Sequence, residues 1–181
     1  MKSHSLELSI PTRAGRFVAH YSENGLAALD FPKAGTPRRG VRTSQRDVPT
    51  IPAQAIFHWH RATKAALKSI LAGQAAKKLP PLDLSAGTEF QKRVWNALRK
   101  ISLGETRSYG EIARQIGKPR AVRAVGGACG ANPIPVLVPC HRVLAANKKL
   151  GGFSGGLNWK RDLLKREGIS FRSDASHHSA P

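Results

Sequence analysis

The chain is organised around an apolar, proline-bounded run that ends in adjacent cysteine and histidine residues. The run extends from Asn132 to Val138 and leads directly into Pro139-Cys140-His141-Arg142-Val143. Only two cysteines occur in the 181 residues, and Cys140 is the one with a potential base beside it. A thiol becomes a useful nucleophile as the thiolate, which a neighbouring base promotes. Residue type alone still favours a small, buried and inert cysteine.

Positive charge is spread along the whole chain. Residues 1–81 contain 13 basic and 4 acidic side chains, residues 82–181 contain 17 and 7, and the formal net charge is +19. A basic surface spread over a folded body suits a polyanion such as nucleic acid. The hydrophobic content of 40% is enough for a packed core, so we do not expect extensive disorder.

The cysteine count and the hydropathy pattern indicate in which cellular compartment the protein is expected. Two cysteines do not form a disulfide framework, and residues 1–10 hold no uninterrupted apolar segment like that of a secretory signal. No stretch approaches the length needed to span a membrane. We therefore expect a soluble cytoplasmic protein, in the cytosol or nucleoid of a bacterium or in the nucleus of a eukaryote.

The first 80 residues predict a small N-terminal domain with an antiparallel sheet and a helix. Alternating apolar residues indicate strands around 6–10, 16–21 and 26–31, and Asn24-Gly25 supplies a turn between the last two. Apolar residues at helical spacing predict a helix over 53–72, which Gly73 ends. Between sheet and helix, residues 32–52 predict a long basic loop.

Residues 83–170 predict a second, mainly α-helical domain, so the fold class is α/β of the α+β kind. Short helices over 110–116 and 120–128, joined by Gly117-Lys118, form a helix-turn-helix pattern. A simple packing hairpin fits that pattern equally well. A glycine-rich loop at 150–156 precedes a last helix over 157–167, and 171–181 reads as a disordered tail. In the last helix we expect the basic residues to face outward: Lys160, Arg161, Lys165 and Arg166.

Residues 88–168 closely resemble the catalytic domain of the O6-alkylguanine-DNA alkyltransferases, also called methylated-DNA–protein-cysteine methyltransferases. Several separated motifs carry this resemblance in order, which is more specific than any one of them. They are Ser108-Tyr109, Arg123-Ala124-Val125-Gly126-Gly127-Ala128, Asn132-Pro133, Pro139-Cys140-His141-Arg142-Val143, Ser154-Gly155-Gly156 and Lys160…Leu163-Leu164…Glu167-Gly168. Residues 1–80 resemble the family only in the order of their predicted elements, which are a small sheet, a helix and a connector.

The resemblance implies direct repair of O6-alkylguanine, and of O4-alkylthymine, in double-stranded DNA. The alkyl group moves irreversibly to Cys140 after the base is flipped out of the duplex, so each molecule works once. His141 takes the thiol proton through water, Glu167 supports His141, and Asn132 fixes the approach to Cys140. No cofactor or metal is implied, and the protein acts as a monomer.

The resemblance also implies which residues hold the DNA and the damaged base. The recognition helix enters the minor groove, where Arg123 holds the vacated position and Tyr109 helps to rotate the nucleotide. Lys118 contacts the phosphate backbone. Four further residues line the base pocket: Val143, Pro135, Phe153 and Ser154.

This sequence departs from the family pattern at two places. Phe153 stands where relatives often carry a tyrosine that hydrogen-bonds the guanine, so Ser154 or backbone N–H groups would have to replace that donor. Some relatives bind zinc in the N-terminal domain, but residues 1–80 contain no cysteine. His58 and His60 there have no cysteine or acidic cluster beside them, which predicts no metal site.

Three other functions stay open from the sequence. The chain could be a non-catalytic protein that binds alkylguanine lesions, although relatives of that kind lack the acceptor cysteine. It could be a basic DNA-binding module without lesion chemistry, which leaves Cys140-His141 unexplained. A cysteine–histidine pair also fits a thiol hydrolase.

Overall fold

The computed structural model describes residues 6–32 and 52–172, which form two compact units. One unit comprises residues up to Thr88 together with Pro133–Leu137, and the other comprises Glu89–Asn132 and residues from Val138 onward. The predicted mixture of a small antiparallel sheet with helices is confirmed. Most of the predicted basic loop, and the predicted tail beyond Arg172, lie outside the described residues.

The first unit contains a three-stranded antiparallel sheet in the order β1-β2-β3. The strands are Leu6–Thr12 (β1), Gly15–Ser22 (β2) and Gly25–Asp30 (β3). Side chains of β2 alternate strictly, and Phe17, Ala19 and Tyr21 are completely buried. Gly25 has a φ of 139°, which the turn before β3 requires and which glycine adopts without strain.

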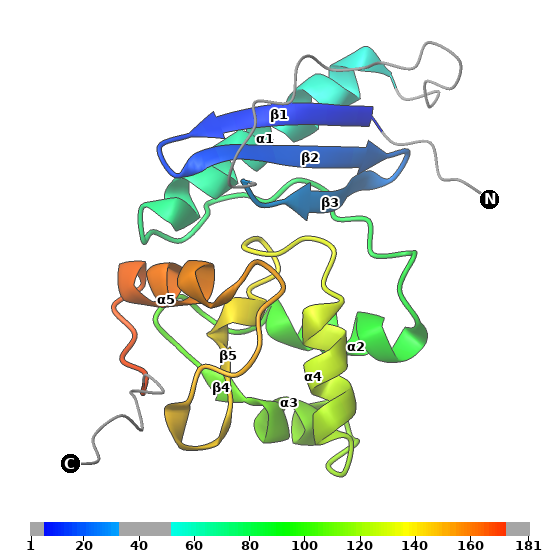
Figure 1. Ribbon diagram of the computed structural model, residues 1–181. Helices are drawn as coiled ribbons and strands as arrows, with labels where there is room; N and C mark the ends of the chain where they lie inside the picture. The colour runs from blue at the N-terminus through cyan, green and yellow to red at the C-terminus, as the bar shows by residue number, and fades with distance from the viewer. Residues whose placement is uncertain (1–5, 33–51, 173–181) are drawn as a thin grey trace. The chain divides into compact units, whose positions relative to one another are not determined.

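One long helix, α1 (Ala53–Leu71), lies across a face of this sheet (Figure 1). Its buried stripe includes Ile56, Leu67 and Ile70, at the helical spacing expected from the sequence. The predicted helix is therefore confirmed, and Gly73 follows its end with a φ of 72°. The segment Pro133–Leu137 joins this unit through a hydrogen bond from the Leu29 N–H to the Pro133 carbonyl, 2.9 Å long.

Three helices pack together in the second unit: α2 (Glu89–Leu98), α3 (Tyr109–Gln115) and α4 (Val122–Gly130) (Figure 1). The Trp95 indole N–H donates to the Ala128 carbonyl at 2.8 Å and so fixes α2 against α4. The small residues of α4 permit this close approach.

The two short helices begin and end at slightly different residues from those predicted. A capping box between Ser108 and Glu111 starts α3 at Tyr109, one residue earlier than expected. Pro119 lies in the turn before α4 and not in its first turn, because the Ala121 N–H bonds the Lys118 carbonyl at 2.8 Å and the helix begins only at Val122.

Short elements complete the second unit around the cysteine. Strand β4 (Arg107–Ser108) pairs in parallel with β5 (Val143–Leu144), and a 3₁₀ turn, η1 (Cys140–Arg142), leads into β5. A second 3₁₀ turn, η2 (Ala146–Lys148), precedes the glycine-rich loop and α5 (Leu157–Arg166). Within the described ranges, no helix is long and apolar enough to cross a bilayer.

Candidate active site

The Cys140 thiol lies in a tight, buried turn. Cys140 begins η1 and is only 3% exposed. Asn132, which follows the end of α4, is buried beside it. The Asn132 Nδ2 group donates to the Val138 carbonyl at 2.8 Å and to Cys140 Sγ at 3.1 Å. One amide therefore fixes both the backbone that leads to the thiol and the sulfur itself.

Burial keeps Cys140 in its thiol form. Removal from water raises the pKa of Cys140 above its ordinary value, because the thiolate is poorly solvated there. The hydrogen bond from Asn132 and the positive charge of Lys160 oppose this rise without cancelling it. A reaction at Cys140 therefore needs a nearby base to take the thiol proton.

A histidine, an arginine and a glutamate form a buried network next to this thiol. His141 Nε2 lies 3.0 Å from Glu167 Oε1, and Arg142 reaches the same carboxylate with Nε–Oε2 at 2.8 Å and Nη2–Oε1 at 2.9 Å. Arg142 Nη1 also donates to the Ile101 carbonyl at 2.7 Å. The 3₁₀ turn places His141 and Arg142 side by side, and Glu167 at the C-terminal end of α5 meets both.

The charge state of this network follows from its contacts. Burial alone would raise the pKa of Glu167, but hydrogen bonds from His141 and Arg142 outweigh it and hold the pKa at about 2. Burial lowers the pKa of His141, against the effect of Glu167, so the imidazole is neutral at pH 7. Since the Glu167 carboxylate only accepts, the single imidazole proton is on Nε2 and Nδ1 is the free acceptor.

His141 Nδ1 is the one buried side-chain nitrogen or oxygen without a hydrogen-bond partner among the described residues. Buried polar atoms are nearly always bonded, so an exception needs a functional or structural explanation. Here the atom is the basic nitrogen of a neutral imidazole on the residue next to Cys140. A nitrogen of this kind is able to accept a proton.

Lys160 is the main departure from the expected surface of the last helix. We expected it to face outward with Arg161, but it is completely buried. Its ammonium group donates to the Val143 carbonyl at 2.7 Å, to the Leu150 carbonyl, and more weakly to the Gly152 carbonyl at 3.4 Å. Burial lowers the pKa of Lys160 to about 8. The side chain therefore ties β5 to the glycine-rich loop.

Substitution Lys160→Met is expected to loosen the glycine-rich loop. The variant leaves the Val143 and Leu150 carbonyls without their buried donor, and each lost hydrogen bond costs on the order of 1 kcal/mol. We expect amide hydrogen exchange of residues 150–156 to accelerate about tenfold, measured by mass spectrometry. Lys165→Met, at an exposed position on the same helix, is the control and should leave that exchange unchanged. Equal exchange in both variants would contradict this role for Lys160.

The glycine-rich loop contacts Tyr109, the first residue of α3. A Cβ atom added at Gly151, whose φ is 64°, would lie 3.0 Å from the Tyr109 hydroxyl oxygen and 3.2 Å from its ring. Burial raises the pKa of Tyr109 to about 12, and the nearby Cys129 and Cys140 add to this rise. The phenol is therefore neutral and available as a donor at physiological pH.

The other predicted site residues lie in different settings. Lys118, in the turn between α3 and α4, and Arg123, in the first turn of α4, are exposed. Phe153 is partly buried and Ser154 is exposed in the glycine-rich loop. Val143 is buried in β5, and Pro135 is buried in the segment that packs with the first unit. Within residues 6–32 and 52–172, no group of three or more potential metal ligands occurs.

Sequence reasoning missed Arg142 and Lys160 as members of the site. A signal for Lys160 was present in the sequence. Helical spacing places it on the same face of α5 as Leu163 and Leu164, and Glu167 follows at the end of the helix. A lysine on the same face as two buried leucines is a candidate for burial with hydrogen bonds. For Arg142 the only signal was its place in the apolar segment after Cys140.

Comparisons with known proteins agree with this geometry. The family model described as 6-O-methylguanine DNA methyltransferase, DNA binding domain, matches residues 89–169. A methylated-DNA–protein-cysteine methyltransferase of Methanosarcina acetivorans is 63% identical over 82 residues, or 45% of this chain and 53% of the relative. One of the same name from Mycobacterium bovis is 57% identical over 101 residues, or 56% of this chain and 61% of the relative. These alignments thus span little more than half of each relative's length.

Solved structures extend the similarity to both units. A crystal structure of Mycobacterium tuberculosis OGT in complex with DNA matches with a TM-score of 0.66 and 41% sequence identity. The match covers 88% of this chain and 90% of that chain.

Proposed function

Because this chain belongs to the methylated-DNA–protein-cysteine methyltransferase family, we propose that it repairs O6-alkylguanine and O4-alkylthymine in double-stranded DNA by moving the alkyl group to Cys140. The observation that carries the proposal is the site itself. A buried thiol accepts a hydrogen bond from Asn132, and the next residue is a neutral histidine with a free basic nitrogen. We expect the protein to act as a monomer, on the DNA of the cytosol or nucleus.

The buried network supplies the base for the reaction. His141 Nδ1 takes the Cys140 proton through a water molecule, and Glu167 stabilises the imidazolium that forms. Arg142 holds the Glu167 carboxylate in place with two hydrogen bonds, which keeps Nε2 protonated and Nδ1 basic. Asn132 Nδ2 donates to the sulfur and stabilises the thiolate as it develops.

The transfer step is a substitution at the alkyl carbon. The Cys140 thiolate forms a carbon–sulfur bond while the bond from that carbon to guanine O6 breaks. The electron pair of the broken bond stays on guanine, which takes up one proton, the equivalent of the one lost by the thiol. A thioether has no easy leaving group, so one chain accepts one alkyl group. We expect this step to need no cofactor.

Delivery of the damaged base depends on exposed residues of α3 and α4. The base must leave the duplex to reach a buried thiol. In our proposal α3 and α4 act as a helix-turn-helix whose second helix enters the minor groove. Arg123 takes the vacated position, Tyr109 helps to rotate the nucleotide, and Lys118 contacts a phosphate.

A pocket for the flipped base completes the proposal. We assign Val143, Pro135, Phe153 and Ser154 to this pocket. Phe153 has no hydroxyl group, so donation to the departing guanine falls to the Ser154 hydroxyl or to backbone N–H groups of the glycine-rich loop. Lys160 holds that loop in place by donating hydrogen bonds to the Leu150 and Gly152 carbonyls.

The test is to follow a labelled methyl group. The protein is incubated with duplex DNA that carries methyl-labelled O6-methylguanine, and peptides are then mapped by mass spectrometry. We expect one label per chain, on Cys140, with no further turnover. Tight lesion binding without a thioether would instead indicate a lesion-binding protein, and equal binding of undamaged DNA without transfer would indicate a plain DNA-binding module.

Substitution Arg123→Ala should separate base extrusion from chemistry. Arg123 is exposed and makes none of the hydrogen bonds of the buried network, so its loss should slow repair of duplex DNA about tenfold or more through base extrusion alone. The reaction with free O6-benzylguanine, which needs no extrusion, should stay within about twofold of the wild-type rate. Arg99→Ala, at an exposed arginine in the turn just after α2, controls for the lost charge. Equal losses on both substrates would exclude a role for Arg123 in extrusion.

A further inference from the structure

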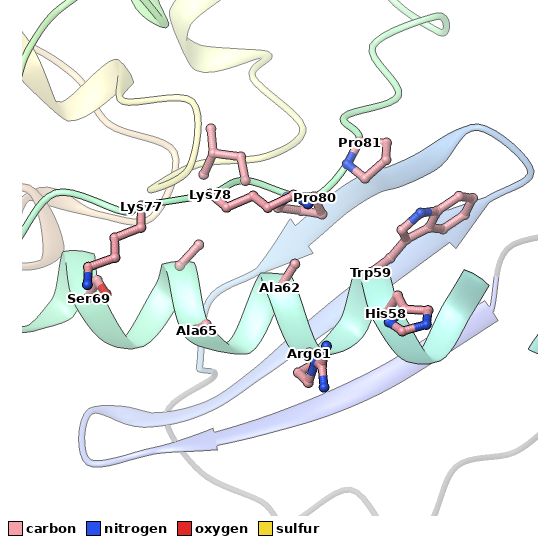
Figure 2. Close-up of a pocket in the computed structure, with 12 residues that line it drawn as sticks. His58, Trp59, Arg61, Ala62, Ala65, Ser69, Lys77, Lys78, Pro80 and Pro81 are labelled. Atoms are coloured by element: carbon pink, nitrogen blue, oxygen red, sulfur yellow. The ribbon is translucent and has the colours of Figure 1, made fainter. Parts of the chain in front are cut away.

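The first unit contains a groove that the proposed repair reaction does not use. It lies between α1 and the connector that follows this helix, and its volume is about 540 Å³. A volume of this size falls in the range of roughly 300–1,000 Å³ typical of ligand sites. Figure 2 shows the side chains of α1 on one side and those of residues 77–81 on the other.

The groove combines a small-residue floor with aromatic and proline walls. Ala62, Ala65 and Ala66 of α1 leave room at its base. Trp59 of α1 and Pro81 of the connector lie near one another at one end (Figure 2). Trp59 is only partly buried, so part of its ring is accessible to a flat partner.

A second accessible aromatic ring adjoins this end of the groove. Phe57 is 64% exposed, which is unusual for a large apolar side chain. Its ring packs edge-on against His58, a lining residue, with ring centroids 6.1 Å apart. The first half of α1 therefore carries the packed rings of Phe57 and His58, with Trp59 next in the chain.

The charged side chains that line the groove are all positive. Arg61, Lys77 and Lys78 line it, and none of its lining residues is acidic. All three cations are exposed, and none forms an ion pair with a carboxylate of the described residues. In Figure 2 Lys77 extends from the connector toward Ser69 of α1, and Lys78 lies along the connector toward Pro80. Such a surface attracts an anionic chain and repels a second copy of this basic protein.

We propose that this groove binds a single-stranded nucleic acid segment, with its phosphates on Arg61, Lys77 and Lys78 and an unpaired base stacked on Trp59. Cations along a groove with interleaved aromatic rings are the combination that binds single strands without sequence preference. A paired duplex could not offer a free base face to Trp59. This site is independent of alkyl transfer to Cys140.

Photocrosslinking with the full-length protein tests the proposal at the groove itself. The probe is a thymidine oligonucleotide without a lesion that carries one 5-iodouracil, and adducts are mapped by mass spectrometry. We expect an adduct on α1 at positions 57–59. Adduct yield against oligonucleotide concentration then gives an affinity for this site, separate from any binding elsewhere on the protein.

Paired charge variants supply the decisive comparison. Lys77→Ala/Lys78→Ala should weaken the affinity about tenfold and lower the slope of log affinity against log salt by about 1.4, since each phosphate contact on a single strand contributes about 0.7. Lys64→Ala/Lys68→Ala removes the same charge from exposed positions of α1 outside the groove and should change the affinity less than twofold. Equal losses in the two pairs, or no adduct on α1, would overturn the proposal.

The aromatic contribution has its own test. Trp59→Leu should reduce the affinity about tenfold, while Trp59→Phe should retain most of it. A polyglutamate peptide is the competitor. If it displaces the oligonucleotide equally well at matched charge and Trp59→Leu has no effect, the groove takes acidic protein segments, which overturns the nucleic acid assignment. Transfer from free O6-benzylguanine to Cys140, measured on every variant, reports separately on the proposed repair function.

Discussion

A protein with Cys140→Ala is expected to accept no methyl group from DNA that contains O6-methylguanine. Among the described residues, the substitution removes the only sulfur that combines a hydrogen bond from Asn132 with a neighbouring base. Alanine fits the small buried site, so the fold and the binding of the lesion should be retained. Transfer should fall below detection in the labelled-methyl assay, while the affinity for damaged duplex stays within about threefold of wild type.

The second cysteine provides the matched control. Cys129 is also buried, and burial, with the nearby Cys140, raises the pKa of its thiol to about 12. No base adjoins it in the chain, since its neighbours are Ala128 and Gly130. Cys129→Ser should therefore keep transfer at one methyl group per chain. Label on Cys129, or transfer by the Cys140→Ala protein, would contradict the assignment of the acceptor.

Substitution Glu167→Gln is expected to destabilise the fold and to slow transfer. The variant leaves the Arg142 guanidinium, 9% exposed, without its anionic partner. Removing one member of a buried ion pair is costly because the other charge stays desolvated. We expect the free energy of unfolding to fall by about 3 kcal/mol at pH 7, measured by urea denaturation. Transfer should slow about 100-fold, since His141 loses the carboxylate that stabilises its protonated form.

The same carboxylate predicts how stability depends on pH. The pKa of Glu167 is lowered from 4.5 to about 2 in the folded protein, so its stabilising effect is fully present above about pH 4.5 and disappears as the pH falls toward 2. That shift corresponds to about 3 kcal/mol. The stability difference between wild type and Glu167→Gln should therefore shrink over this acid range.

A surface glutamate separates this effect from a general change of charge. Glu105 pairs with Arg107 at 3.3 Å, with both side chains largely exposed. Exposed ion pairs contribute between about 0 and 1 kcal/mol. Glu105→Gln should change the stability by less than about 1 kcal/mol at either pH. A loss as large as that of Glu167→Gln would show that net charge, and not the buried network, sets the difference.

Local sequence patterns were sufficient to predict which segments form strands and helices. Alternation of apolar residues predicted β1, β2 and β3, and helical spacing predicted α1 to within one residue. Such patterns are reliable because the period of the backbone decides which side chains share a face. The beginning of α4 was less accurate, since the turn at Pro119 depends on details of a few hydrogen bonds.

Those sequence patterns could not predict a strained backbone conformation in the segment that leads to Cys140. Val136 lies between two prolines of the segment 133–139 and has a φ of 75°, which is rare for a β-branched residue. Strain of this kind costs about 1–3 kcal/mol and persists only where packing enforces it. Val136 is completely buried, so packing of the folded chain holds it in this conformation.

The sequence by itself determined the α+β class, the adjacent Cys140 and His141, and the ordered motifs that place the chain in its family. Only the tertiary structure decided what surrounds the thiol. It brought Asn132 to the sulfur, joined Glu167 to both His141 and Arg142, and buried Lys160 beneath the glycine-rich loop. The physical reason is that burial and hydrogen-bond partners set the charge state of a side chain, and these partners come from segments distant in the sequence.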